Sequence, residues 1–377
     1  MHRSKSRGLI ILGITLLVIV LASTWFASSE KGLEVYPSVH LTAKKMLSEY
    51  NPHLAGTAGD TEVFIFEGSE PGGTILVLGG THGDEPAGVV AALVLAENAK
   101  VSKGRLIVIP FANRSGMTHN LPQEGHPSFY TLETPNGERI IKFGSRVTNP
   151  VHQWPDPTVY VQQVDGQKLA GVESRNLNRA YPGTADGTLT SRIAYGIVEL
   201  IKQEKVDVAI DFHESSPEYP VNNAIVAHER AMELAVLASL DLSFEGVDIG
   251  IEPSPVTLRG LSHREWGDNT SVYAFLLESA NPSQGRLRGT TNEDLVISGR
   301  DPMYVKAYER GRLYVQYPAT GIPLSVRTGR HVATTQAIAR VFSEFYPDRS
   351  IVIEGIPSYD ELVERGAGAF LSPSRNL

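Results

Sequence analysis

The chain has 377 residues, of which 41% are hydrophobic and 20% charged, a composition that indicates a folded core and excludes a disordered, collagen-like or coiled-coil protein. Residues 1–28 contain three basic side chains and no acidic one, so the remainder holds 31 basic and 42 acidic residues. A net charge of −11 on that part argues against binding to nucleic-acid phosphates. Because cysteine is absent, disulfides, thiolate zinc sites and cysteine nucleophiles are excluded, and any metal must rely on His and carboxylate ligands.

The N-terminal segment has the pattern of a membrane helix. Leu9 to Ala27 form an uncharged apolar run of 19 residues with basic residues before it and polar residues after it. A helix of that length spans roughly the ~30 Å hydrocarbon layer. A buried core helix is the alternative, but it would not explain the basic flank. We expect residues 1–30 to form an uncleaved signal anchor, with the following domain outside the cytoplasm, periplasmic or at the cell surface, or secreted if the segment is cleaved.

The rest of the chain alternates short apolar runs with helical patterns. Apolar spacing predicts a first helix over Pro37–Tyr50. Strands are expected at Glu62–Phe66, Thr74–Leu78, Leu106–Pro110, Val206–Phe212, Ala224–Ala227 and Val272–Leu277. Helices are expected at Pro86–Asn98, Thr190–Glu204, Glu229–Leu242 and His331–Tyr346. This alternation is typical of an α/β domain with a largely parallel sheet and helices on its faces.

We therefore expect one α/β domain over residues 35–347. It carries an insertion near 117–173, in which only a strand or hairpin around Val159–Val164 is predicted, and a second insertion near 286–320. Residues 348–377 are expected to form a C-terminal extension.

The first chemical motif is Gly79-Gly80-Thr81-His82-Gly83-Asp84-Glu85-Pro86, directly after a predicted strand. His82 and Glu85 are three residues apart in a strand-to-helix turn, so both side chains can point at one spot, while Pro86 opens the helix. Ligands gather at the carboxyl ends of such strands. Two interpretations stay open here: a metal site, or a Glu that favours a helix N-terminus beside an unrelated His.

The second motif, Asp211-Phe212-His213-Glu214, ends an apolar strand. Alternation places Asp211 and His213 on one face, so His213 is a candidate third ligand and Asp211 can orient it. Two His and one carboxylate leave a fourth zinc position open for water, which indicates a hydrolytic site. The alternative is a lone His exposed at a strand end.

The third motif runs from Arg175 to Gly183, Arg-Asn-Leu-Asn-Arg-Ala-Tyr-Pro-Gly. Two arginines and two short amides within five residues suit a loop that grips a carboxylate with paired hydrogen bonds. Such a loop can equally be a solvated surface turn.

The fourth motif places Glu278 at the end of an aromatic and aliphatic strand. Burial should raise the pKa of this carboxyl group, and a nearby metal should lower it again. Glu278 would then suit the removal of a proton from water and its transfer to a leaving nitrogen. The alternative is an acid that reaches solvent.

Taken in order, these motifs resemble a known family. The sequence G-x-H-G-x-E, then R-x-L-N-R with aromatic-Pro-Gly, then D-x-H-E and a strand-terminal Glu is similar to the succinylglutamate desuccinylase and aspartoacylase branch of the zinc metallocarboxypeptidase superfamily, over roughly Thr74 to Glu278. The resemblance implies a three-layer α/β/α sandwich around a mixed, largely parallel sheet, one Zn²⁺ per chain, and hydrolysis of an amide beside a carboxylate.

The resemblance also assigns roles to individual residues. It implies that His82, Glu85 and His213 are the zinc ligands and that Glu278 is the catalytic general base. Asn178 and Arg179 match the pair that holds the substrate carboxylate. Arg175, in the same motif, is expected to bind substrate or to stabilise the oxyanion, and Arg114 is an alternative for that role.

Three functions remain in view. The first is a membrane-tethered zinc hydrolase that deacylates an N-acyl amino acid or a short peptide with a free carboxylate. The second is an extracytoplasmic carboxypeptidase or amidase acting on short or cell-wall peptides, which export favours. The third is an inactive protein that captures anions with the arginine loop.

Overall fold

The computed structural model describes residues 2–28 and 30–375 and contains a nine-stranded mixed sheet. Its strands are β1 (Ala43–Met46), β2 (Glu62–Glu67), β3 (Glu70–Leu78), β4 (Lys100–Ile109), β9 (Val208–Ser215), β10 (Ala224–Ala227), β11 (Gly250–Pro253), β12 (Tyr273–Ala280) and β13 (Val352–Glu354). The order is β1-β2-β4-β3-β9-β12-β10-β11, and β13 pairs with β4. The central strands β4, β3, β9 and β12 run parallel, whereas β2 and β10 run antiparallel to their inner neighbours.

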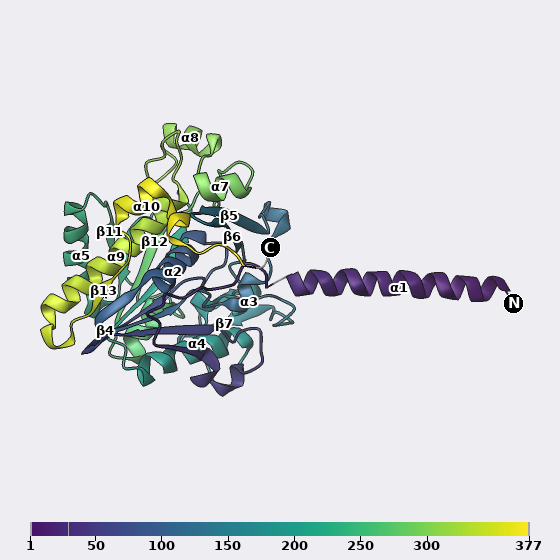
Figure 1. Ribbon diagram of the computed structural model, residues 1–377, viewed down its shortest axis with the longest axis horizontal. Helices are drawn as coiled ribbons and strands as arrows, with labels where there is room; N and C mark the ends of the chain where they lie inside the picture. Colours follow the sequence, from purple (N-terminus) through teal and green to yellow (C-terminus); the bar gives the residue numbers. More distant parts are fainter. Residues whose placement is uncertain (1, 29, 376–377) are drawn as a thin grey trace.

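Helices cover both faces of this sheet, as Figure 1 shows. They are α2 (Pro86–Asn98), α3 (Arg114–Met117), α4 (Leu189–Gln203), α5 (Met232–Phe244), α6 (Ser262–Asn269), α7 (Glu293–Ser298), α8 (Pro302–Glu309), α9 (Leu324–Phe345) and α10 (Tyr359–Arg365). Helices α2, α5 and α9 pack on one face and α4 and α6 on the other. The predicted α/β/α sandwich with a mixed, largely parallel sheet is confirmed.

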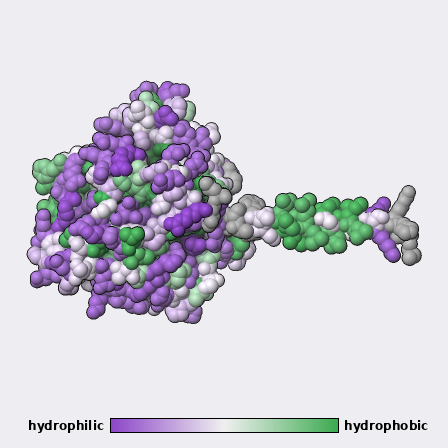
Figure 2. Space-filling view, in the orientation of Figure 1, coloured by the Kyte–Doolittle hydropathy of each residue, from purple (hydrophilic) through white to green (hydrophobic). Residues whose placement is uncertain are grey.

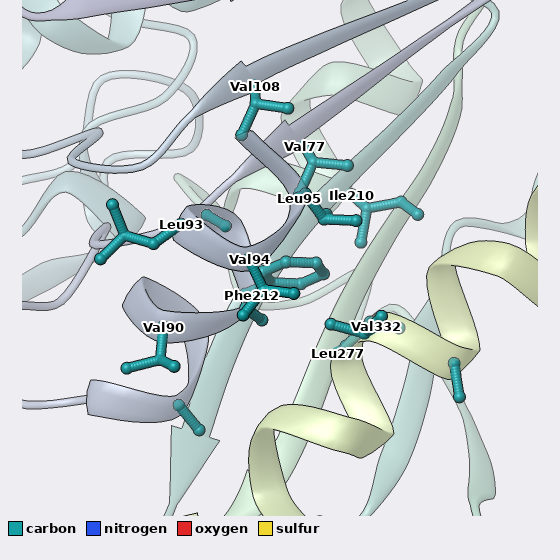
Figure 3. Close-up of a cluster of buried hydrophobic side chains, with 14 of the residues drawn as sticks. Val77, Val90, Leu93, Val94, Leu95, Val108, Ile210, Phe212, Leu277 and Val332 are labelled. Atoms are coloured by element: carbon teal, nitrogen blue, oxygen red, sulfur yellow. The ribbon is translucent and has the colours of Figure 1, made fainter. Parts of the chain in front are cut away.

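Alternation along the central strands builds two separate cores. In β9, Ile210 and Phe212 join the larger core under α2 and α9, whereas Ala209 joins the core under α4. Figure 3 shows part of the larger core. Its labelled side chains are Val77, Val90, Leu93, Val94, Leu95, Val108, Ile210, Phe212, Leu277 and Val332. Because both faces are covered, the strands are apolar on both sides until they reach the edge where they end.

Most predicted elements lie within a few residues of the observed ones, and α2 and β10 have the predicted bounds. The helix predicted over Pro37–Tyr50 is wrong. That segment instead contains β1, which pairs antiparallel with β2, and a short 3-10 helix at Leu47–Glu49. The apolar residues there belong to an edge strand and a turn, although their spacing matches that of a helix.

The two expected insertions have structure of their own. The first contains the hairpins β5–β6 (Phe129–Thr134 and Gly137–Lys142) and β7–β8 (Val159–Val161 and Lys168–Ala170). The second contains α7 and α8. The C-terminal extension contributes β13, which pairs antiparallel with the first residues of β4, and packs α10 against α9.

Helix α1 (His2–Ser28) projects away from the sandwich in Figure 1. Its segment Lys5–Thr24 has a mean hydropathy of 2.2 and none of it is buried. Figure 2 shows this helix as an apolar rod beside a mostly polar domain surface. Its length and composition suffice to cross a membrane.

A buried ion pair ties α9 to the sheet. Arg327 lies 2.7 Å from Glu214 at the end of β9, and both side chains are fully buried. The second carboxylate oxygen of Glu214 accepts a hydrogen bond from the backbone N–H of Ala87 in the first turn of α2. Arg327 also donates to the carbonyls of Val296 and Ile322. Glu214 therefore connects two helices to the strand that carries His213.

Replacing Arg327 by methionine should lower the free energy of unfolding by about 3 to 5 kcal/mol, because Glu214 would stay buried without its ionic partner. The matched control is Arg340→Met on the same helix, where the guanidinium pairs with Asp241 at the surface. That change should cost less than about 1 kcal/mol. Urea unfolding followed by circular dichroism measures both. Equal stability of the two variants would contradict the role of the buried pair.

Candidate active site

Three side chains from two separate parts of the chain meet at the carboxyl edge of the sheet. His82 and Glu85 lie in the turn between β3 and α2, and His213 lies in β9. Each offers one ligand atom, and these atoms lie within 4.8 Å of one another. The Nδ1 atom of His82 is 2.8 Å from one oxygen of Glu85, and Nδ1 of His213 is 3.0 Å from the other. All three side chains are at most 2% exposed.

The local backbone explains how the first two residues reach this point. Gly80 has φ of +65°, a conformation that favours glycine, and lets the chain turn sharply after β3. Glu85 occupies the position just before α2, with Pro86 as the first helical residue. One Glu85 oxygen also accepts a hydrogen bond from the backbone N–H of Glu214, 2.9 Å away. The turn is therefore held directly on the end of β9.

Polar neighbours orient both imidazole rings. The side-chain amide N–H of Asn176 donates to Glu173, and the side-chain oxygen of Asn176 accepts the backbone N–H of Asn178. That oxygen lies 2.9 Å from Nε2 of His82. Nε2 of His82 must then donate, and Nδ1 keeps a lone pair that faces Glu85.

His213 has a carboxylate close to its other ring nitrogen. Its Nε2 lies 3.0 Å from an oxygen of Asp211, whose other oxygen accepts a hydrogen bond from Thr81 at 2.7 Å. Asp211 is fully buried. The expectation that Asp211 orients His213 therefore agrees with the observed contact. An oriented imidazole with a carboxylate behind it is the usual arrangement of a metal-binding His.

The charges at this point favour a cation. Burial would lower the pKa of His213, but the carboxylates of Asp211 and Glu85 raise it to about 10. Burial would raise the pKa of Glu85, but the two imidazoles hold it well below its usual range. Burial, together with Arg146, lowers the pKa of His82 to about 4.

The donor set fits zinc. Two ligands about 2 Å from one tetrahedral ion are about 3.3 Å apart, close to the two separations measured from Glu85. The imidazole rings stand nearly perpendicular, at 80° with centroids 4.6 Å apart, so they approach the shared point from different directions. Two His and one carboxylate also leave one zinc position for water or substrate.

The same three residues line a cavity of about 620 Å³. Glu278 lines it too, because it is the register partner of His213 on the neighbouring parallel strand and so shares its face of the sheet. Burial raises the pKa of Glu278 to about 8, although His213 acts in the opposite direction. One of its oxygens is buried and has no hydrogen-bond partner among the described residues. This carboxyl group can therefore hold or release a proton near neutral pH.

Asn178 and Arg179 also line the cavity. They lie in a short 3-10 turn, Leu177–Arg179, which is anchored because the Asn178 oxygen accepts the backbone N–H of Ser262 at 2.8 Å. Its amide N–H groups remain for a ligand. Burial and the nearby charge of Arg146 lower the pKa of Arg179. Two guanidinium groups near one another in a cavity create a site for an anion.

Arg146 also lines the cavity, although none of the four sequence motifs includes it. Its guanidinium lies 3.2 Å from Glu85 and 3.3 Å from Nδ1 of His82. Two backbone hydrogen bonds place it there, from Gly83 to the carbonyl of Ser145 and from Gly144 to the carbonyl of Gly83. A Cβ at Gly83 would lie 2.8 Å from the Gly144 backbone, so this approach requires glycine.

The other two predicted arginines lie elsewhere. Arg175 forms a bidentate ion pair with Asp156 and donates to the carbonyl of Thr148, and it does not line the cavity. Arg114 binds Glu30 near the start of the domain. Residues of one motif thus have different positions: Asn178 and Arg179 face the cavity, whereas Arg175 stabilises the loop through its ion pair. The assignment of Arg175 to the substrate is not supported by this geometry.

No family model matches the chain. Among curated proteins, it is 22% identical over 290 residues to N-alpha-acetyl-L-2,4-diaminobutyric acid deacetylase of Halomonas elongata, covering 72% of this chain and 71% of that protein.

Two of the solved structures that are similar to this chain illustrate the range of the matches. One is a succinylglutamate desuccinylase from a Silicibacter species, with a TM-score of 0.37 and 19% identity over 60% of this chain and 55% of the other. The chain thus spans about half the length of that desuccinylase. The other is a metallo-carboxypeptidase from Burkholderia cenocepacia, with a TM-score of 0.46 and 9% identity over 86% of this chain and 69% of the other.

The relatives therefore carry names of enzymes that hydrolyse amide bonds. The sequence similarity to a deacetylase agrees with the resemblance predicted from the four motifs, to the succinylglutamate desuccinylase and aspartoacylase branch of the zinc metallocarboxypeptidase superfamily.

Proposed function

We propose that this chain is a zinc-dependent hydrolase that cleaves an amide bond next to a carboxylate, as an N-acyl amino acid deacylase does. The observation that carries the proposal is that His82, Glu85 and His213 converge in the same cavity as Glu278 and two arginines. A candidate metal site, a carboxyl group with a raised pKa and an anion-binding pair are the parts that such a reaction needs. The similarity to a deacetylase supports the same class of reaction.

A zinc ion on these three residues would supply positive charge that polarises a carbonyl group and lowers the pKa of water. Glu278, which shares a sheet face with His213, takes the proton from the attacking water. It then passes this proton to the departing nitrogen. Its burial and its raised pKa suit it to carry a proton in the middle of the reaction.

The arginines and Asn178 position the substrate. Arg179 and the amide N–H groups of Asn178 hold the carboxylate beside the scissile amide and so fix which carbonyl reaches the site of attack. Arg146 lines the cavity beside His82 and Glu85, and its side chain is 40% exposed. We assign to Arg146 the stabilisation of negative charge on the carbonyl oxygen, in place of Arg175 or Arg114.

Helix α1 supports a membrane-tethered location. Its apolar segment has basic residues before it, which favours retention of that end in the cytoplasm. We therefore propose that the domain acts outside the cytoplasm, anchored by α1.

A carboxypeptidase or amidase acting on short peptides is the second candidate. It is favoured by the cavity, which extends beyond the reacting groups to Tyr219 and to an apolar wall around Leu258. A peptide with a free C-terminal carboxylate would use the same residues. Relative rates on N-acyl amino acids and on di- and tripeptides distinguish the two candidates.

Replacing His82 by alanine should abolish stoichiometric zinc binding, because one of three ligands and its Asn176-oriented ring are lost. Elemental analysis of purified protein measures the metal content. His228→Ala is the matched control, since His228 contacts Asp268 outside the cluster. Undiminished zinc in the His82 variant would contradict the proposed site, and zinc absent from the unaltered protein would favour an anion-binding protein.

Replacing Glu278 by glutamine should retain zinc and lower kcat by a factor of about 10² to 10⁴, the usual contribution of a general acid–base group. Glutamine has the same shape but cannot accept the proton. Glu233→Gln on the exposed side of α5 removes an equal charge and should leave kcat unchanged. A fully active, zinc-loaded Glu278→Gln protein would remove the assignment of the base.

Replacing Arg146 by methionine should lower kcat by a factor of about 10² to 10³, as the loss of one oxyanion donor does. Arg114→Met, outside the cavity, should keep the activity. Steady-state kinetics on an N-acetyl amino acid, with circular dichroism to verify folding, compares the variants. If a folded Arg114→Met protein lost activity and Arg146→Met did not, the oxyanion role would pass to Arg114.

A further inference from the structure

The cavity continues away from the metal-ligand cluster into a section with mostly aliphatic walls, here called the side pocket. Its walls are Val226, Pro253, Pro255, Leu258, Leu261 and Leu276. None of the roles assigned above uses these residues. An apolar pocket beside a reacting centre selects substrates by the hydrophobic part of a side chain.

One charged side chain, Glu252, lines the side pocket. In the sheet, Val226 is the register partner of both Leu276 and Glu252, so the three side chains lie in a row on the cavity face. Ile251, the residue before Glu252, packs instead against the core on the opposite face. The direction of the Glu252 side chain therefore follows from strand alternation.

Glu252 has no partner among the described residues, in contrast to the cavity carboxylate Glu85. Glu85 contacts two imidazoles and Arg146, whereas no ion pair or hydrogen bond joins the Glu252 carboxylate to another of the residues 2–28 and 30–375. It is only partly exposed and has aliphatic neighbours. A carboxylate in such surroundings attracts a cation and repels an anion more strongly than one in open solvent.

The side pocket is attached to the turn that faces the cavity with Arg179. Beyond Leu258, the carbonyl of Gly260 accepts the N–H of Tyr181, and Ser262 donates its N–H to Asn178. The wall at Leu258 and Leu261 is thus fixed next to the proposed carboxylate site. An amino acid whose carboxylate is held by Arg179 would extend its side chain along this wall.

We infer that the side pocket selects substrates in which the amino acid bearing the free carboxylate has an aliphatic side chain ending in an ammonium group, such as lysine or a shorter diamino acid. The methylene groups contact the aliphatic walls, and the ammonium pairs with Glu252. Acidic side chains are rejected because they would place a second negative charge beside an unpaired one. This inference rests on the proposed function for the position of the carboxylate.

The test compares three acylated amino acids that differ in side-chain charge: Nα-acetyl-lysine, N-acetyl-norleucine and N-acetyl-glutamate. Lysine and norleucine have side chains of similar length, so their ratio isolates the ammonium group. We expect the zinc-loaded full chain to hydrolyse the lysine compound with a kcat/KM at least about tenfold above the others, a factor that one ion pair supplies. Glu252→Gln should remove this preference by lowering kcat/KM for the lysine compound to the level of the norleucine compound.

Two further variants sharpen the comparison. Glu252→Lys should reverse the order in favour of the glutamate compound, and Glu233→Gln, which removes a charge outside the cavity, should keep the preference of the unaltered chain. Equal kcat/KM for the lysine and norleucine compounds in the unaltered chain, or a preference that survives Glu252→Gln, would overturn the inference.

A binding measurement separates failure of this inference from failure of the proposed function. If no acylated amino acid is hydrolysed, the deacylase proposal fails, and calorimetric titration with free lysine and norleucine still tests the side pocket. Tighter binding of lysine that is lost in Glu252→Gln supports the inference. Equal binding of the two amino acids contradicts it.

Discussion

The burial of Glu85 is the constraint on which the site depends. This carboxylate is 1% exposed and sits at the start of α2, where it contacts His82, His213, Arg146 and the backbone of Glu214. A buried carboxylate is tolerated only where positive charge and hydrogen-bond donors surround it. The positive charge and the N–H donors come from Arg146, from His213 and from the backbone of Glu214, in two segments remote from Glu85 in sequence. Satisfying this one side chain therefore brings the end of β9 and an inserted loop to the turn before α2.

Strand alternation divides the ionisable residues at the end of β9 between two tasks. Asp211 and His213 point to the cavity face, whereas Glu214 points to the opposite face and pairs with Arg327 of α9. Asp211 and His213 belong to the candidate metal site, whereas Glu214 holds α2 and α9, which cover the larger core. Neighbouring residues can therefore carry separate functions, because a single step along a strand moves a side chain from one layer of the sandwich to the other.

The segment before the arginine motif is part of the site as well as an insertion. Gly144 and Ser145 pair with the backbone of Gly83, and this contact brings the next residue, Arg146, to His82 and Glu85. Arg175 instead fastens the loop that carries Asn178 and Arg179. The sequence does not distinguish an arginine that lines a cavity from one that forms a buried ion pair. Only the contacts in the folded chain show whether the guanidinium is available to a ligand or holds a loop in place.

Much of this protein could be predicted from its sequence. Period-two and period-3.6 patterns located the central strands and α2, and strand-terminal motifs identified the residues that meet at the carboxyl edge, since parallel strands end at the same side of a sheet. Local pattern failed at β1, where pairing with β2 decides the structure. The local sequence pattern also does not indicate Arg146 or Glu252, because their positions depend on contacts between segments distant in the chain. Arg146 depends on the close approach of Gly83 and Gly144. Glu252 depends on the row that it forms with Val226 and Leu276 across three strands. Short sequence motifs indicate which reactive side chains a site contains. The shape and charge of the cavity walls depend instead on which strands become neighbours in the folded sheet.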